Sequence, residues 1–238
     1  MDGSVEDYLT RFGYLRAGGD TERALREFQS RHAVPVTGEL DEPTAYELGR
    51  LRCGLPDVDD RLGAATGCAW VGPELVWAFG PDATGLDPAV ARAAVVRAFD
   101  TWRAAVPITL RPAGPGEEPQ VSVEWRSAAD PDHSMVGRVV AHADFPGACA
   151  LVTATLPKPL HFDDTETRWA DGAAPFRVDV ETVALHEIGH LLGLRHSTVR
   201  EAVMYPTVPV GRVARVLRAD DLAAAQALYP VSRAAPRG

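Results

Sequence analysis

The segment VALHEIGHLLGLRHS, residues 183–197, restricts the folds open to this chain more than any other feature. His186 and His190 are four residues apart, so on a helix their side chains lie on one face, about one turn from each other. Both imidazoles can then reach one zinc ion, with Glu187 beside them in a position to activate water. If the chain turns back after the helix, His196 becomes a third ligand. One zinc position then stays open, which is typical of a catalytic rather than a structural site.

The residues before this motif support a helix at this place. Asp179 is a suitable N-cap, and Glu181 complements the positive end of the helix dipole. A His-Glu-x-x-His pattern alone also arises by chance on ordinary amphipathic helices. The prediction of a metal centre therefore depends on the additional histidine at the extended spacing.

The charge balance argues against one class of partner. The chain has 24 Lys and Arg residues against 33 Asp and Glu residues, a formal net charge of −9, whereas a nucleic-acid-binding protein normally presents a basic face. No apolar run approaches the roughly 20 residues that span a bilayer. The opening segment MDGSVEDYLTRFGYL has no basic stretch followed by an apolar one, so no signal peptide is expected, and both a cytoplasmic and an exported protein stay open.

Two regions of different composition follow each other along the chain. Residues 5–50 are expected to form a small helical unit in which Asp20 and Asp41 cap two helices. A segment rich in Asp and Gly, residues 57–67, joins this unit to a region of mixed strand and helix patterns. Strands are expected at 74–79, 108–112, 120–125 and 137–143, and a last helix at 219–229.

The most periodic helix of the second region covers residues 87–105. Its buried face is expected to carry Val90, Ala94, Val95, Ala98 and Trp102. A strand, a helix, several strands and then helices are typical of an α+β or mixed α/β domain, here of about 170 residues.

Other segments resemble one known family. AVMYP at 202–206 is similar to its Met-turn, VVAHADFP at 139–146 to the strand beside its active-site cleft, and LHFDDTETRW at 160–169 to its structural-metal loop. With Ser197 directly after His196, the sequence resembles the matrixins, the matrix metalloproteinase branch of the metzincin superfamily. The resemblance implies an α+β fold. A small three-helix propeptide domain, similar to peptidoglycan-binding modules, precedes a zinc-protease domain with a twisted mixed sheet.

The resemblance also implies a reaction, the hydrolysis of internal peptide bonds in extended protein or peptide substrates. Glu187 would act as the general base, and Met204 would pack beneath the zinc without binding it. The implied boundaries are a propeptide at 1–57, an activation linker at 58–69, a catalytic domain at 70–230 and a tail at 231–238.

A second zinc and a calcium ion follow from the same resemblance. The candidates for the family's structural zinc are His133, His142 and His161, with Asp132 or Asp130 as the fourth ligand. Asp163 and Glu166 match positions that usually hold calcium, but TLPKP, residues 155–159, replaces the glycine-rich calcium loop. The alternative for His142 and His161 is that they are ordinary polar residues on a strand and a loop.

The resemblance further predicts how a substrate binds. An extended peptide is expected to add as an antiparallel strand along residues 139–143, with main-chain hydrogen bonds at Val140 and Ala141. The family usually has a Pro-x-Tyr wall in the pocket just past the scissile bond. This chain has PTV there, so Val208 replaces the tyrosine, and an apolar side chain is expected to enter.

Cys53 stands in RCGLPD, residues 52–57, where glycine and proline favour a fixed loop over a helix or strand. The segment resembles the family's cysteine switch, with Leu51 in place of the usual proline. The resemblance implies that the Cys53 thiolate binds the catalytic zinc as a fourth ligand and keeps the protein latent. Arg52 and Asp57 can pair and brace the loop.

Two other interpretations stay open. One is a non-catalytic module in which residues 5–50 bind the cell wall and the protease-like region is inactive, although the intact zinc motif argues against it. The other is a metalloprotease that works inside the cell on one partner. A disulfide between Cys68 and Cys149 would indicate an oxidising compartment, and free thiols a reducing one. Family resemblance favours an extracellular monomer that acts on proteins or peptides, has neither a nucleic-acid partner nor a membrane span, and contacts a cell wall through the propeptide.

Overall fold

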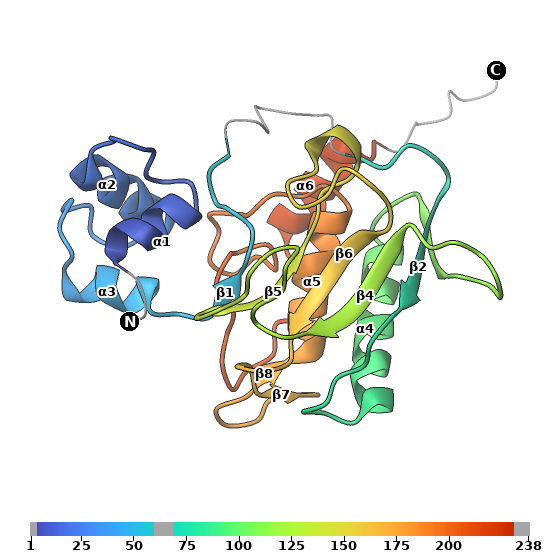
Figure 1. The fold of residues 1–238 in the computed structure, drawn as a ribbon. Helices are drawn as coiled ribbons and strands as arrows, with labels where there is room; N and C mark the ends of the chain where they lie inside the picture. The colour runs from blue at the N-terminus through green and yellow to red at the C-terminus, as the bar shows by residue number, and fades with distance from the viewer. Residues whose placement is uncertain (1–3, 60–68, 231–238) are drawn as a thin grey trace, which may run out of the picture.

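The computed structural model describes residues 4–59 and 69–230 and begins with a unit of three short helices (Figure 1). The helices are α1 (Val5–Arg11), α2 (Thr21–Arg31) and α3 (Glu42–Leu48). The side chain of Asp20 caps α2 and that of Asp41 caps α3, as the sequence predicts. Leu9, Phe12 and Phe28 pack together in a small core between these helices.

The second region is built around a six-stranded sheet with the strand order β1-β5-β6-β4-β2-β3. Neighbouring strands are parallel except for β5 and β6, which are antiparallel, so the sheet is mixed as expected. Two further strands, β7 (Trp169–Ala170) and β8 (Val178–Asp179), pair separately. The six strands of the sheet are β1 (Arg52–Cys53), β2 (Glu74–Phe79), β3 (Thr109–Pro112), β4 (Val121–Arg126), β5 (Val139–Ala143) and β6 (Lys158–Asp163).

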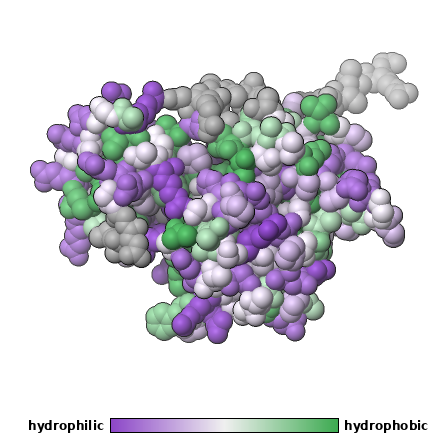
Figure 2. Space-filling model, in the orientation of Figure 1, coloured by the Kyte–Doolittle hydropathy of each residue, from purple (hydrophilic) through white to green (hydrophobic). Residues whose placement is uncertain are grey.

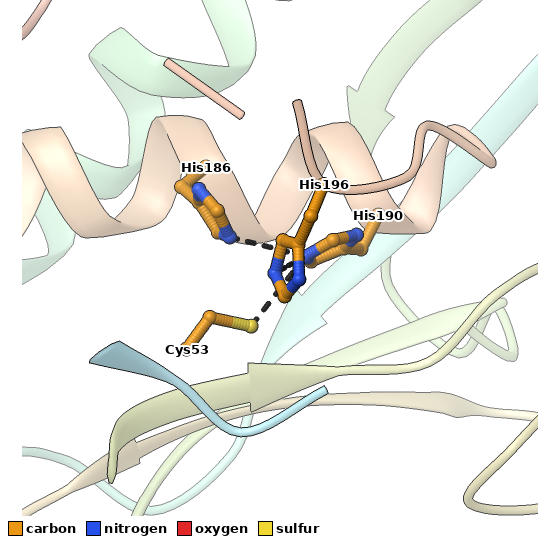
Figure 3. Close-up of side chains that lie close together, drawn as sticks. All are labelled: Cys53, His186, His190 and His196. Atoms are coloured by element: carbon orange, nitrogen blue, oxygen red, sulfur yellow. Dashed lines mark hydrogen bonds between the residues drawn. The ribbon is translucent and has the colours of Figure 1, made fainter. Parts of the chain in front are cut away.

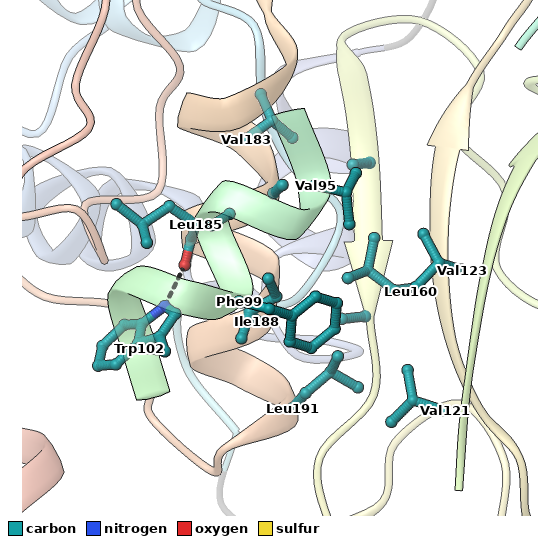
Figure 4. Packing of buried hydrophobic residues seen from close by; sticks show 14 of the residues in the cluster. Val95, Phe99, Trp102, Val121, Val123, Leu160, Val183, Leu185, Ile188 and Leu191 are labelled. Carbon is teal, nitrogen blue, oxygen red and sulfur yellow. Dashed lines mark hydrogen bonds between the residues drawn. The ribbon is translucent and has the colours of Figure 1, made fainter. Parts of the chain in front are cut away.

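Two long helices pack on each other and on the sheet to form the main core (Figure 4). They are α4 (Pro88–Arg103) and α5 (Val180–Leu191), and the chain continues to α6 (Ala219–Leu228). The indole Nε1 of Trp102 on α4 donates a hydrogen bond of 2.7 Å to the carbonyl of Leu185 on α5. Helix α5, which carries the histidine motif, is therefore held by α4 on one side, and it contacts β5 as well.

Two sequence-based predictions are wrong. Val90 is 38% exposed, because the buried stripe of α4 begins at Ala91 and Val90 lies beside it in the first turn. Arg52 and Cys53 are not in a loop but form the edge strand β1, which pairs with β5 in the parallel sense. The local glycine and proline gave no sign of this pairing, because the partner strand lies far away in the sequence.

Residues 60–68 and 231–238 lie outside the described residues, and with them most of the predicted linker, the tail and Cys68. The question whether Cys68 pairs with Cys149, left open by the sequence, therefore also lies outside them. The face drawn in Figure 2 mixes polar and apolar residues. Within the described residues, no helix has the length and apolar character needed to cross a lipid bilayer.

Candidate metal centre

The three histidines of the sequence motif converge at one point (Figure 3). Nε2 of His190 lies 3.0 Å from Nε2 of His186 and 3.1 Å from Nε2 of His196. Helix α5 supplies the first two imidazoles, and the turn after it brings the third. On the outer side, the Nδ1 atoms of His186 and His190 lie 2.8 Å from the carbonyl oxygens of Val203 and Leu194. These contacts orient the Nε2 lone pairs toward the common point.

Burial keeps the three imidazoles neutral. It lowers the pKa of His186 to about 3, helped by the nearby His196. Burial and the neighbouring imidazoles also hold the pKa of His190 well below its usual value, and burial lowers the pKa of His196. Neutral imidazole is the form that binds a metal ion, so the site is preset for one.

Cys53 completes this group from the side opposite helix α5 (Figure 3). Its Sγ atom lies 3.4 Å from Nε2 of His190 and 3.6 Å from Oε2 of Glu187. The side chain is fully buried, and burial together with the charge of Glu187 raises the pKa of the thiol well above its usual value. A thiolate at this place therefore needs a cation beside it.

The donor set fits zinc. One sulfur and three imidazole nitrogens lie close enough together to bind a single ion, and this combination suits tetrahedral Zn²⁺. Glu187 is fully buried next to them, and its Oε1 atom has no hydrogen-bond partner among the described residues. Burial raises the pKa of Glu187 to about 8, and a dication nearby would lower it again.

The segment around Cys53, residues 51–57, is called here the switch loop. It lies between β5 and the segment that contains Pro206, and it forms main-chain hydrogen bonds with both. The N–H of Gly54 donates to the carbonyl of Ala141 at 2.9 Å, and that of Cys53 donates to the carbonyl of Pro206 at 3.0 Å. A Cβ atom at position 54 would lie 3.0 Å from the Val139 side chain and 3.1 Å from that of His142, so a larger residue would have to push these neighbours aside.

The residues predicted to bind substrate lie around the switch loop. The N–H of Val208 donates to the carbonyl of Leu51 at 2.8 Å. Val208 also lines a pocket, together with His186, Val183 and Ala214. Val140 and Ala141 lie on β5, and the carbonyl of Ala141 faces the loop. The groups expected to receive a substrate are thus engaged by the chain's own N-terminal region.

Met204, which the resemblance predicts in a Met-turn, packs against Gly189 of the helix that carries His186 and His190. It is 1% exposed, and a Cβ atom at Gly189 would come within 2.3 Å of its sulfur. Glycine at this position of α5 therefore makes room for the methionine. The turn is also joined to the chain after the third histidine, because the N–H of Ser197 donates to the carbonyl of Met204 at 2.8 Å.

The predicted pair of Arg52 and Asp57 braces the switch loop. The guanidinium donates two hydrogen bonds to the carboxylate, at 2.7 and 3.0 Å. Asp57 also receives a hydrogen bond of 2.7 Å from the hydroxyl of Tyr14, so it is tied to the helical unit as well. A further contact could not be predicted from the sequence: Oδ1 of Asp57 lies 2.7 Å from Nδ1 of His196.

A second cluster of candidate ligands lies behind β5. Oδ2 of Asp130 lies 3.0 Å from Nε2 of His142 and 2.6 Å from Nδ1 of His161, and these three residues could hold a metal ion. The other two residues named from the sequence lie differently. Asp132 is half-exposed and 4.0 Å from His161, and Nε2 of His133 lies 2.8 Å from the carbonyl of Gly54 in the switch loop.

The predicted calcium residues are engaged within their own loop. The carboxylate of Asp163 accepts hydrogen bonds from the N–H groups of Thr165 and Glu166, at 2.9 and 3.1 Å. Oε2 of Glu166 accepts one of 2.8 Å from the N–H of Gly137. Within the described residues, these two carboxylates do not gather with a third ligand into a candidate metal site.

An ion pair that could not be predicted from the sequence organises the loop after β5. Asp144 is fully buried and accepts hydrogen bonds from the N–H groups of Phe145, Leu151, Val152 and Thr153. Lys158, the only lysine in the sequence, lies 3.2 Å from its Oδ2 atom and also donates to the carbonyl of Thr153. The loop built in this way packs on Cys53.

Replacing Lys158 with methionine should therefore lower the free energy of unfolding by about 3 to 5 kcal/mol, because it leaves the buried charge of Asp144 without its cation. Chemical denaturation of the full chain would measure the change. Arg212→Met, which removes an exposed cation, serves as the matched control and should have little effect. A loss below about 1 kcal/mol in Lys158→Met would mean that the hydrogen bonds from the main chain suffice for Asp144.

Comparisons with known proteins agree with these observations. A family model described as matrixin matches residues 69–230, and a model for a peptidoglycan binding domain matches residues 3–48. Matrix metalloproteinase-19 of Homo sapiens is 33% identical over 94% of this chain and 44% of its own length. Matrilysin of Felis catus is 31% identical over 85% of this chain and 77% of its own length, and metalloendoproteinase 4-MMP of Arabidopsis thaliana is 29% identical over 94% and 71%. The chain thus spans less than half the length of the human relative.

Proposed function

This chain belongs to the matrixin family, and on that premise we propose that it is a latent zinc metalloendopeptidase that Cys53 keeps inactive. The observation that carries the proposal is the convergence of Cys53, His186, His190 and His196 on one point, with Glu187 beside them. The proposed parts are a propeptide over residues 1–57, a linker over 58–69 and a catalytic domain over 70–230.

The proposed reaction is the hydrolysis of internal peptide bonds. A bound zinc ion supplies a Lewis acid that polarises the scissile carbonyl and lowers the pKa of water. Glu187 accepts a proton from the attacking water and transfers it to the leaving amine. The pocket beside His186, with Val208 in its wall, receives an apolar side chain of the substrate.

The switch loop suppresses this reaction in two ways. The Cys53 thiolate would serve as the fourth ligand of a bound zinc ion, and its sulfur lies 3.6 Å from Oε2 of Glu187, where the reaction needs water. The loop also engages the carbonyls of Ala141 and Pro206 and the N–H of Val208, which an extended substrate would use. It runs parallel to β5, whereas we propose that a substrate runs antiparallel.

We propose a second zinc ion at Asp130, His142 and His161, supported by their buried cluster. His133 and Asp132 are candidates to complete it after a local rearrangement, since His133 is engaged with Gly54. Calcium at Asp163 and Glu166 stays a prediction. By family resemblance we propose that the protein acts outside the cell on protein substrates, as a monomer.

Metal analysis combined with a peptide-cleavage assay tests the function. The full chain should contain zinc and cleave slowly, and limited proteolysis within residues 58–69 should produce activity. Peptidoglycan binding by the full chain without zinc or cleavage would instead support a cell-wall-binding module. Activity that appears only in a reducing cytosol toward a single protein would support the intracellular alternative.

Replacing Cys53 with serine should make the full chain active without processing, by at least about tenfold over the wild type, because a hydroxyl is a far poorer zinc ligand than a thiolate. The cleavage rate of a short peptide would measure this. The processed wild type defines full activity in the same assay. Equal, low activity in the wild type and in Cys53→Ser, beside an active processed form, would show that the propeptide blocks the cleft by bulk alone.

A further inference from the structure

The three histidines among the four candidate zinc ligands differ in which group contacts their outer nitrogen, Nδ1. The Nδ1 atoms of His186 and His190 face carbonyl groups of the catalytic region, from Val203 and Leu194. Nδ1 of His196 faces the carboxylate of Asp57, at 2.7 Å. This contact has the length of a hydrogen bond but not its directional geometry, so it is an electrostatic contact. Of the described residues, Asp57 is the only acidic one within 4.0 Å of the His196 ring nitrogens.

Asp57 is held firmly in this place. Its side chain is 2% exposed, and the Arg52 guanidinium donates one hydrogen bond to each of its carboxylate oxygens. The hydroxyl of Tyr14 donates to it from the helical unit, and the main-chain N–H of Asp57 donates to the carbonyl of Phe12 at 3.0 Å. The two hydrogen bonds from Arg52 thus place a guanidinium charge against the carboxylate that meets His196.

We propose that Asp57 is a positioning residue for His196, and that the switch loop thereby holds zinc in the latent protein through two residues, Cys53 directly and Asp57 through the third histidine. The inference rests on the zinc site of the proposed function. A carboxylate beside the outer nitrogen of a ligating histidine raises the basicity of the ring by its charge, and loss of a carboxylate partner typically costs 10- to 100-fold in metal affinity.

Two consequences follow for activation. When the propeptide leaves, the catalytic region loses both a ligand and the partner of His196, while His186 and His190 keep their carbonyl partners. The active form should therefore release zinc faster than the latent form by more than the loss of Cys53 explains. Because coupling between two binding events is reciprocal, bound zinc also strengthens docking of the propeptide by the same factor.

The rate of zinc loss to a chelator tests the proposal in the full chain. Asp57→Asn keeps the size of the side chain and removes its charge, and zinc loss should become about 10- to 100-fold faster. Tyr14→Phe is the matched control, because it removes a hydrogen bond to the same carboxylate and leaves the contact with His196. It should change the rate by less than about threefold. The chain with His190→Ala identifies which zinc belongs to this site.

A double-variant comparison separates His196 from Cys53. If Asp57 acts through His196, Asp57→Asn should accelerate zinc loss by a similar factor in the wild type and in the Cys53→Ser background. If it only fixes the loop that carries Cys53, the effect should vanish in that background, and the proposal is overturned. With cobalt in place of zinc, the sulfur-to-metal absorption band should persist in Asp57→Asn, and its loss would likewise assign the effect to Cys53.

The remaining outcomes are also decisive. An unchanged rate in Asp57→Asn, with zinc bound at the three histidines, overturns the role of Asp57 and leaves the proposed function intact. A wild-type chain with no zinc at the histidines removes the proposed function itself. Should Asp57→Asn fail to fold, Asp57→Glu serves in the same comparison, since it keeps the charge beside Arg52 but displaces it by one methylene group.

Discussion

A chain with His190 replaced by alanine is expected to lose about one equivalent of zinc and at least about 10³-fold of its peptidase activity. His190 is the central member of the cluster, since its Nε2 atom lies within 3.4 Å of donor atoms from Cys53, His186 and His196. Without it, two imidazoles remain in the active form, which make an incomplete zinc site. Metal analysis and the cleavage of a peptide by the processed protein would measure both losses.

His161→Ala is the matched control for this experiment. It removes a buried histidine from the second cluster, beside Asp130 and His142, and should reduce total zinc and stability while the first zinc and the activity persist. A full zinc content in His190→Ala would mean that the catalytic metal lies elsewhere. A wild-type metal count and melting temperature in His161→Ala would mean that the second cluster binds no zinc.

The parts of the site that the sequence could predict depend on local patterns. Helix α5 begins at its predicted cap, Asp179, because a side-chain acceptor and the following apolar residues lie within a few positions of one another. The spacing of His186 and His190 then fixes their common face. A strand such as β4 was visible for the same reason, since its buried residues alternate.

The contacts that the sequence could not predict join distant segments. Pairing with β5 makes Arg52 and Cys53 of the switch loop an edge strand, and nothing in RCGLPD specifies that partner. The contact of Asp57 with His196 and the ion pair of Asp144 with Lys158 also depend on how the chain closes in three dimensions. Composition and periodicity contain no information about such closures.

In the second cluster, the sequence predicts the correct loop but not which of its residues contact the two histidines. Asp130 and Asp132 are two residues apart in the same loop, so sequence spacing does not distinguish them. Only the folded loop brings the Asp130 carboxylate between His142 and His161 and leaves Asp132 half-exposed. His133 likewise has the right residue type but faces the carbonyl of Gly54.

Replacing Glu187 with glutamine should leave zinc bound and reduce turnover by about 10²- to 10⁴-fold, because an amide cannot accept the proton of the attacking water. The change is nearly isosteric, and Glu187 is not among the four converging donors, so the metal should stay. Glu187 is fully buried beside the histidines, so its carboxylate stands where it can reach water at the proposed zinc site. Turnover and zinc content of the processed protein would be measured together.

Glu181→Gln provides the matched control, since it neutralises the other glutamate of the same helix. Glu181 lies in the first turn of α5 and pairs with Arg97 and Arg215, away from the histidines. Its loss should cost some stability and leave turnover within a few-fold of the wild type. Near-wild-type turnover in zinc-loaded Glu187→Gln would remove Glu187 from the general-base role. An equal loss of turnover in both variants would indicate a general effect on α5, because only a carboxylate beside the metal can act on the water.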